Sequence, residues 1–239
     1  MMSAVWNDPR VSRGMATQLD RRRERLFVGE KALGWKLAFG APAVLERLAL
    51  AGPLVGFLME RALLASGTTL SLLDWKKPVV EPELAVHIGI DLPGGADRAA
   101  AKAAIASLAP AIELADVEHP QKVVEDMLAG NISQRNVILG RADVSRAGGV
   151  LDGLSGRLLR NGTEVASTSD PQAMTGELID LVRHVADYLA AFGETLFAGQ
   201  IIIAGAIMPP VWVETSEEIV FTLDPIDSIS VRFAVMSKT

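Results

Sequence analysis

Two glutamates one residue apart, Glu81 and Glu83, are the side chains of this sequence best suited to chemistry. They lie in an apolar run typical of a β-strand, where side chains alternate faces, so both point to the same side. A third glutamate, Glu113, lies in a second short apolar run. Three carboxylates in a chain without cysteine suit a hard cation such as Mg²⁺ or Mn²⁺, which prefers oxygen ligands. The alternative is that all three are solvated surface residues, because carboxylates usually lie at the surface.

A lysine precedes these glutamates by about the length of one supersecondary unit. Lys36 stands in the segment 34–40, between two glycines and directly after Trp35. Taken alone, it reads as an ordinary exposed lysine. Taken with the glutamate pair and the later Glu113, the order and spacing resemble the 2-keto-4-pentenoate hydratase and 4-oxalocrotonate decarboxylase branch of the fumarylacetoacetate hydrolase superfamily. The resemblance extends from about residue 28 to about residue 235, and includes Asn131 and the segment 199–205.

The resemblance implies roles for these residues. Glu81, Glu83 and Glu113 would hold a divalent cation, Mg²⁺ or Mn²⁺, which would bind the carboxylate and 2-oxo oxygens of a small 2-keto acid. Polarising that carbonyl stabilises the dienolate formed when a proton moves. Lys36 would contact the substrate and take part in proton transfer, either by holding the negative charge of the enolate or, if burial lowers its pKa, by losing a proton.

Several positions depart from the family pattern. Glu60 is the carboxylate nearest to an expected acidic position, but it is offset by one residue and Arg61 takes that place. We therefore predict that Glu60 assists Lys36 in catalysis. The acidic residue expected before Asn131 is Gly130, and we predict that Asn131 binds substrate.

Two further departures lie later in the chain. A Gly-x-Gly segment of the family becomes residues 167–171, with Ser167 as a predicted substrate contact and Pro171 nearby to reshape the pocket. Gln200 stands where the family commonly has aspartate. The proposed metal ligands and the lysine match the family pattern, whereas many of the residues expected around them do not.

The three histidines offer no separate mechanism. His87 shares the strand face of the glutamate pair, so it lines the cavity or is a satisfied wall residue. His119 and His184 fall at the start of one predicted helix and on another, without a His-x-x-x-His pair. The sequence also contains no GxSxG nucleophile elbow and no phosphate-cradling glycine loop.

Composition limits the classes of function. Of the 239 residues, 49% are hydrophobic and 22% are charged, which indicates a globular protein with a substantial core. The net charge of -6 argues against nonspecific nucleic-acid binding. The short basic cluster 21–25 reads as the solvated face of a helix, with phosphate binding as the alternative. The N-terminus lacks a secretory-signal pattern and charges interrupt the apolar region 41–73, so we expect a cytoplasmic protein without membrane contact.

The pattern of elements predicts an α+β fold, and the resemblance implies a rolled, mostly antiparallel β structure with flanking helices and the site in its mouth. We expect an N-terminal helical segment over residues 1–30 and one catalytic domain over residues 31–239. Helices are predicted at residues 11–31, 43–50, 97–108, 120–129 and 174–192. Strands are predicted around the glutamates and at residues 136–139, 200–206, 218–223 and 228–236, and Pro110 should end the third helix. A hairpin with an Asn-Gly turn is predicted at residues 158–165.

These observations lead to one main hypothesis and three alternatives. The main one is a metal-dependent hydratase that converts a 2-hydroxy-2,4-dienoate to a 4-hydroxy-2-oxo acid, as in the breakdown of aromatic rings. Decarboxylation of a 2-oxo-enedioate would use the same dienolate, and C–C hydrolysis of an acylpyruvate would need a base such as His87. The alternative of another class is a non-catalytic descendant that binds a keto acid. The apolar stretches 52–58 and 201–210 further predict a homo-oligomer.

Overall fold

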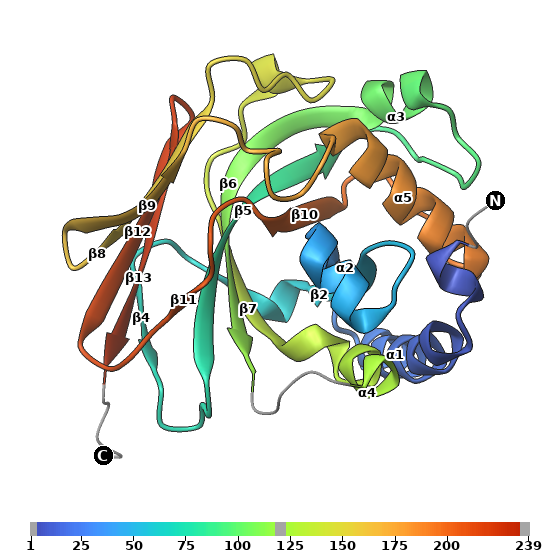
Figure 1. Cartoon of the computed structure of the whole chain (residues 1–239), viewed down its shortest axis with the longest axis horizontal. Helices are drawn as coiled ribbons and strands as arrows, with labels where there is room; N and C mark the ends of the chain where they lie inside the picture. Colours follow the sequence, from blue (N-terminus) through green and yellow to red (C-terminus); the bar gives the residue numbers. More distant parts are fainter. Residues whose placement is uncertain (1–3, 118–122, 235–239) are drawn as a thin grey trace.

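The computed structural model describes residues 4–117 and 123–234, which form two β-sheets flanked by helices (Figure 1). The larger sheet has eight strands in the order β2-β1-β10-β5-β6-β7-β3, with β11 paired to β5. Its strands are β1 (Ala32–Ala38), β2 (Leu54–Met59), β3 (Leu63–Leu64), β5 (Pro78–Ile88), β6 (Ile105–Asp116), β7 (Gln134–Leu139), β10 (Ile201–Ala206) and β11 (Val211–Trp212).

The smaller sheet has five strands in the order β4-β13-β12-β8-β9. They are β4 (Thr68–Ser71), β8 (Ser155–Arg160), β9 (Thr163–Thr168), β12 (Glu217–Asp224) and β13 (Asp227–Ala234). The pairs β1–β10, β3–β7 and β4–β13 are parallel and the other strand pairs are antiparallel. The prediction of an α+β fold with a mostly antiparallel sheet is confirmed.

In the described part of the chain, five α-helices lie beside the sheets: α1 (Pro9–Phe27), α2 (Pro42–Leu48), α3 (Arg98–Ala104), α4 (Val124–Ala129) and α5 (Leu178–Ala191). Short 3₁₀ turns lie at Val5–Asn7, Glu60–Ala62, Asn131–Ser133 and Val144–Arg146. Asp8 caps α1 by accepting the Arg10 N–H at 2.8 Å, which satisfies a helix N-terminal donor. Among the described residues, no helix is both long and apolar enough to cross a membrane.

The eight-stranded sheet curls so that one of its faces is enclosed. Small and aliphatic side chains on that face, including Ala85, Ala109 and Ala111, have no exposed surface. Next to them in the strand register lie Lys36 and the glutamates of β5 and β6. The opposite face joins the main hydrophobic core, to which α1 contributes Val11. The division into an N-terminal segment and a catalytic domain stays a prediction.

Two predicted elements are wrong in their bounds. The third helix ends at Ala104 and not at residue 108, because β6 begins at Ile105 and pairs with β5 along its length. Pro110 therefore lies inside a strand, where its carbonyl oxygen accepts the Gly140 N–H at 2.9 Å. The last helix begins at Leu178 and not at residue 174, after a turn at residues 171–175. His119 and the start of the helix predicted at 120–129 lie outside the described residues.

The two apolar stretches that suggested an oligomer are covered within the single chain. All six residues of β2 are buried, and the first four residues of β10 are buried as well. β10 lies between β1 and β5, whereas β2 is an end strand of the sheet whose free edge is bonded by the Asn131 side chain at Phe57. These stretches no longer support an oligomer, so the oligomeric state stays a prediction without them.

Candidate metal centre and substrate cavity

Three carboxylates converge on the enclosed face of the large sheet. Glu81 of β5 lies opposite Glu113 of β6 in the strand register, and Glu83 follows Glu81 on the same face. One carboxylate oxygen from each residue lies within 4.8 Å of one from each of the others. Glu83 and Glu113 have no exposed surface. The alternative of solvated surface glutamates is therefore excluded.

Two carboxylate oxygens of this cluster are buried without a hydrogen-bond partner in the described part of the chain. Glu83 accepts the Gly205 N–H at 2.8 Å with Oε2, while its Oε1 is unpartnered. Glu113 pairs with Lys36 through Oε1, and its Oε2 is unpartnered. A buried acceptor left unsatisfied costs about 1–3 kcal/mol, so a cluster of them needs a ligand. Convergent carboxylate oxygens fit a divalent cation such as Mg²⁺ or Mn²⁺.

The electrostatics of the three glutamates also favour a bound divalent cation. Burial, followed by the neighbouring Glu113 charge, raises the pKa of Glu81 to about 7. Burial and the charges of Glu113 and Glu81 raise the pKa of Glu83 well above its ordinary value. Lys36 opposes both shifts but supplies only one positive charge for three carboxylates. A divalent cation would supply the missing charge.

Lys36 reaches this cluster from β1. Only 2% of its side chain is exposed, its Nζ pairs with Glu113, and the same atom donates to the Ile132 carbonyl oxygen at 3.4 Å. Burial alone would lower the pKa of Lys36, but the charges of Glu113 and Glu81 outweigh it, so this pKa is raised and the ammonium stays charged. The sequence-based alternative of an exposed lysine is wrong.

A glycine on the next strand leaves room for the lysine stem. A Cβ added at Gly56 would lie 3.0 Å from Lys36 Cγ and 3.0 Å from Asn131 Oδ1. The Asn131 side chain bridges to β2, because its Oδ1 accepts the Phe57 N–H at 2.8 Å and its Nδ2 donates to the Phe57 carbonyl at 2.9 Å. Both ends of the amide are thus occupied by backbone, and Asn131 does not line the cavity described below.

The turn that carries Asn131 is strained. Asn131, Ile132 and Ser133 have φ values of 51°, 51° and 60°, a left-handed conformation that costs L-residues roughly 1–2 kcal/mol each. Such a conformation persists only where its surroundings impose it, and it is concentrated at functional sites. Here it presents the Ile132 carbonyl to Lys36 and the Ile132 side chain to the cavity. The turn therefore positions the lysine.

A cavity of about 830 Å³ opens beside the cluster. Lys36 and Glu81 belong to its lining, and most of the remaining lining is apolar. One wall comes from α2 and another from the start of β5 and from β11. The apolar wall residues are Leu37, Ala38, Phe39, Ala41, Val44, Leu48, Pro53, Val79, Ala115, Val117, Ile132, Met174, Leu181, Ala204, Ala206, Pro210 and Trp212.

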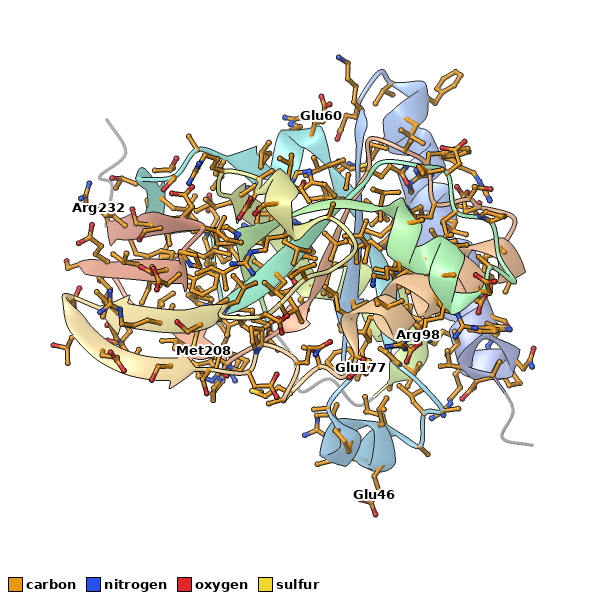
Figure 2. The ribbon with its side chains drawn as sticks, turned by 90° about the horizontal axis from the view of Figure 1, so that it is seen from above. Glu46, Glu60, Arg98, Glu177, Met208 and Arg232 are labelled. Carbon is orange, nitrogen blue, oxygen red and sulfur yellow. The ribbon has the colours of Figure 1, made fainter. Side chains whose placement is uncertain are left out.

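Several predicted site residues do not reach this cavity. Glu60 is exposed in the 3₁₀ turn after β2, and in Figure 2 it lies on the side of the molecule opposite α2. Ser167 lies on β9 of the smaller sheet, in a separate polar groove that it shares with Arg157 and Asp224. Gln200 accepts the Trp35 indole N–H at 3.1 Å, which is a structural bond. His87 is half-buried and outside the lining, and burial lowers its pKa.

Other lining residues were missed in the sequence. Arg47, Lys77, Met174, Thr175 and Trp212 carry no motif in the sequence. Only Lys77 had a usable signal, because it stands four residues before Glu81 and therefore on the same strand face. The others come from short loops or elements whose positions depend on the tertiary fold.

Comparison with known sequences assigns the chain to a family. Residues 41–234 match the sequence profile described as "Fumarylacetoacetate (FAA) hydrolase C-terminal". The chain belongs to this fumarylacetoacetate hydrolase family. Within the family, it is similar to "4-oxalocrotonate decarboxylase" from Pseudomonas sp, with 29% identity over 189 residues, 76% of this chain and 71% of that protein.

Two further relatives agree with this assignment. The chain is 27% identical to "2-keto-4-pentenoate hydratase 2" from Dechloromonas aromatica over 222 residues, 92% of this chain and 84% of that one. Among fumarylacetoacetate hydrolase family structures, it resembles 4-oxalocrotonate decarboxylase from Pseudomonas putida complexed with magnesium and adipate. The TM-score is 0.85 at 25% identity, with 97% of this chain and 90% of that chain covered.

Proposed function

We propose that this protein is a metal-dependent lyase that hydrates a small 2-hydroxy-2,4-dienoate to a 4-hydroxy-2-oxo acid, as in the breakdown of aromatic compounds. The observation that carries the proposal is the enclosed cluster of Glu81, Glu83 and Glu113 beside Lys36, at one side of a largely apolar cavity. Two named hydratases and a decarboxylase with a bound magnesium ion are among the similar proteins.

The three glutamates would hold the cation, Mg²⁺ or Mn²⁺. When bound, such a cation supplies Lewis acidity toward the oxygens of a 2-keto acid and charge for the dienolate. The donor set fits this role, because all three ligands are carboxylates and two of their buried oxygens have no partner among the described residues. Structures of the similar decarboxylase contain magnesium or calcium, which supports a divalent cation without selecting one.

Lys36 would stabilise the negative charge of the enolate and take part in proton transfer. Hydration moves the proton of the 2-hydroxyl group off oxygen, adds a proton at C5, and then adds water with its hydroxyl at C4 and its proton at C3. Since the carboxylates raise the pKa of Lys36, this side chain is an ammonium, which can hold the enolate charge and is not suited to act as a base. Ile132 and the Glu113 carboxylate fix the position of Nζ.

A second candidate is decarboxylation of a 2-oxo-enedioate, which forms the same dienolate by loss of CO₂. The similarity to 4-oxalocrotonate decarboxylases in sequence and in fold favours it specifically. C–C hydrolysis of an acylpyruvate is less well supported, because that reaction needs a base and His87 does not line the cavity. We retain the predicted roles of Lys36 and the three glutamates. Glu60, Asn131 and Ser167 are not proposed as substrate contacts.

The test is turnover by purified protein loaded with Mg²⁺ or Mn²⁺. Loss of the ultraviolet absorbance of a 2-hydroxydienoate would report hydration, and CO₂ release from a 2-oxo-enedioate would report decarboxylation. Both should stop when the cation is removed with a chelator. Inertness toward dienoates, enedioates and acylpyruvates alike would contradict the proposal and favour a non-catalytic keto-acid-binding protein. We also propose a cytoplasmic location and a homo-oligomer, which fractionation and light scattering can test.

A further inference from the structure

Two positively charged side chains line the cavity away from the carboxylate cluster. Arg47 lies on α2 and Lys77 immediately precedes β5, and both are exposed at the cavity surface. Neither side chain forms an ion pair with the described residues, in contrast to Arg10 nearby on α1, which pairs with Asp8 at 2.6 Å. Glu81 is the only carboxylate in the described lining, and it belongs to the metal cluster. The cavity therefore carries an unbalanced positive charge at a distance from the proposed metal.

The strand β5 sets the spacing between the two ends of the cavity. Lys77, Val79 and Glu81 alternate with residues of the opposite face, so all three present their side chains to the same side. At about 3.3 Å of rise per residue, the Lys77 and Glu81 backbones are about 13 Å apart. Val79 lies between them, opposite Trp212 of β11 in the strand register, and forms an apolar middle section.

This order matches one class of molecule. Carboxylates at one end would hold the cation for a 2-keto acid group, apolar walls would contact a short carbon chain, and cations would meet an anion at the far end. Arginine and lysine both form charge-assisted hydrogen bonds with carboxylates, and the arginine fork can do so with two parallel bonds. A monocarboxylic substrate would leave both cations without a partner.

We infer that Arg47 and Lys77 form a subsite for a second carboxylate, so that the protein selects 2-keto dicarboxylic acids over 2-keto monocarboxylic acids of the same length. This inference rests on the proposed function, because it places the 2-keto acid group at the glutamate cluster. It specifies the substrate class that either reaction, hydration or decarboxylation, would use.

The test compares two unreactive probes in the presence of Mg²⁺: 2-oxohexanedioate and 2-oxohexanoate, which differ only in the distal group. Calorimetric titration should show tighter binding of the diacid by about tenfold, the scale of one charge-assisted contact at a partly solvated site. Arg47→Gln or Lys77→Met should each reduce that difference, and the double variant should remove it. Higher salt should also reduce the difference in the unmodified protein.

A double variant outside the cavity serves as the control. Arg157→Gln with Lys102→Met removes the same charge from exposed positions on β8 and α3, so it should keep the preference for the diacid. Equal affinities for the two probes, or a preference that survives in the Arg47/Lys77 double variant, would overturn the inference alone. If neither probe binds in a manner that depends on Mg²⁺ and Glu83, the proposed function fails and the inference with it.

Discussion

The two sheets carry charge in opposite ways. On the smaller sheet, Arg232 pairs with Glu218 at 2.8 Å across β12 and β13, and 58% and 36% of these side chains are exposed. On the larger sheet, three carboxylates share the single ammonium of Lys36, and Glu83 and Glu113 have no exposed surface. Exposed ion pairs contribute little to stability, whereas buried charges without full compensation are costly.

This difference in burial and charge pairing explains why the glutamates of the larger sheet qualify as a site and the polar residues of the smaller sheet do not. The polar groove on the smaller sheet also gathers charged and hydroxyl side chains, among them Arg157, Ser167 and Asp224. Those groups stay solvated and need no ligand. By contrast, the pKa values of Glu81 and Glu83 are raised, and Glu83 and Glu113 each have a buried oxygen without a partner among the described residues, which a bound cation would relieve. An excess of buried charge of one sign, and not the presence of polar residues, marks the functional centre.

Removal of Lys36 should have the largest effect. Lys36→Met should lower turnover by about a hundredfold or more, because the ammonium proposed to hold the enolate charge is lost from the cavity. The Mg²⁺-dependent rise in melting temperature should persist, since the three carboxylates remain. Lys102→Met, an exposed lysine of α3, is the matched control and should leave turnover unchanged. An active Lys36→Met protein would show that the buried lysine is structural only.

The next largest effect should follow from neutralising one buried carboxylate. We expect Mg²⁺ to raise the melting temperature of the unmodified protein, because a ligand bound only to the folded state stabilises by about 2.7 kcal/mol at a hundredfold excess over Kd. Glu83→Gln should abolish that response and leave the metal-free protein at least as stable, since one buried charge is gone. Glu218→Gln on the smaller sheet should keep the full response. A Mg²⁺ response in Glu83→Gln equal to that of the unmodified protein would remove Glu83 from the ligand set.

The strained turn before β7 should be the third most sensitive feature. Asn131→Ala leaves the Phe57 N–H and carbonyl buried without partners, so we expect a loss of about 1–3 kcal/mol in the free energy of unfolding. Asn131→Gly removes the same bonds but adopts the left-handed conformation readily, so it should be less destabilising. Denaturant unfolding of both variants measures the two contributions. Equal stability of the glycine and alanine variants would mean that the turn stores no strain.

Some residues of this centre could be predicted from the sequence, and others could not. Strand alternation is a local property, so it placed Glu81 and Glu83 on one face, whereas the resemblance to the family joined Lys36 and Glu113 to them. The residues of the cavity walls could not be predicted from a local pattern, because the tertiary fold brings Arg47 and Trp212 into these walls. Glu60 was predicted because it is the carboxylate nearest to an acidic position of the family pattern, but it is exposed in the turn after β2.

The fold shows the same division. Binary patterning predicted most helices and strands, including the hairpin of β8 and β9, because each reflects a local period. The segment that begins at Ile105 was assigned to a helix on its alanine content, yet it forms β6 because pairing with β5 outweighs a weak propensity. Tertiary contacts decided where sequence signals conflicted.

The pH dependence of stability also tests the buried charge of the cluster, and its expected effect is smaller than those of the substitutions above. Burial and Glu113 raise the folded-state pKa of Glu81 to about 7, above the ordinary value of 4.5. Between these two values the folded protein holds a proton that the unfolded chain has released, so the metal-free protein should lose stability as pH rises from 4.5 to about 7. Cation binding requires the released form, so Mg²⁺ should stabilise more at pH 8 than at pH 5.5, with affinity changing roughly tenfold per pH unit for each proton released. Melting curves with and without Mg²⁺ measure both trends. A Mg²⁺ shift of the same size at both pH values would argue that the glutamates are already ionised.

The exposed pair on the smaller sheet should show the smallest effect of all. Glu218→Gln removes the partner of Arg232, but both side chains keep contact with water, so the unfolding free energy should change by no more than about 1 kcal/mol. Its size should fall further in high salt, which screens exposed charges, and it should not depend on Mg²⁺. Denaturant titrations at low and high salt provide the measurement. If Glu218→Gln destabilised the protein as strongly as Asn131→Ala, the contrast between the two sheets would be lost, because an exposed, paired charge would then matter as much as the buried contacts that hold Lys36 in place.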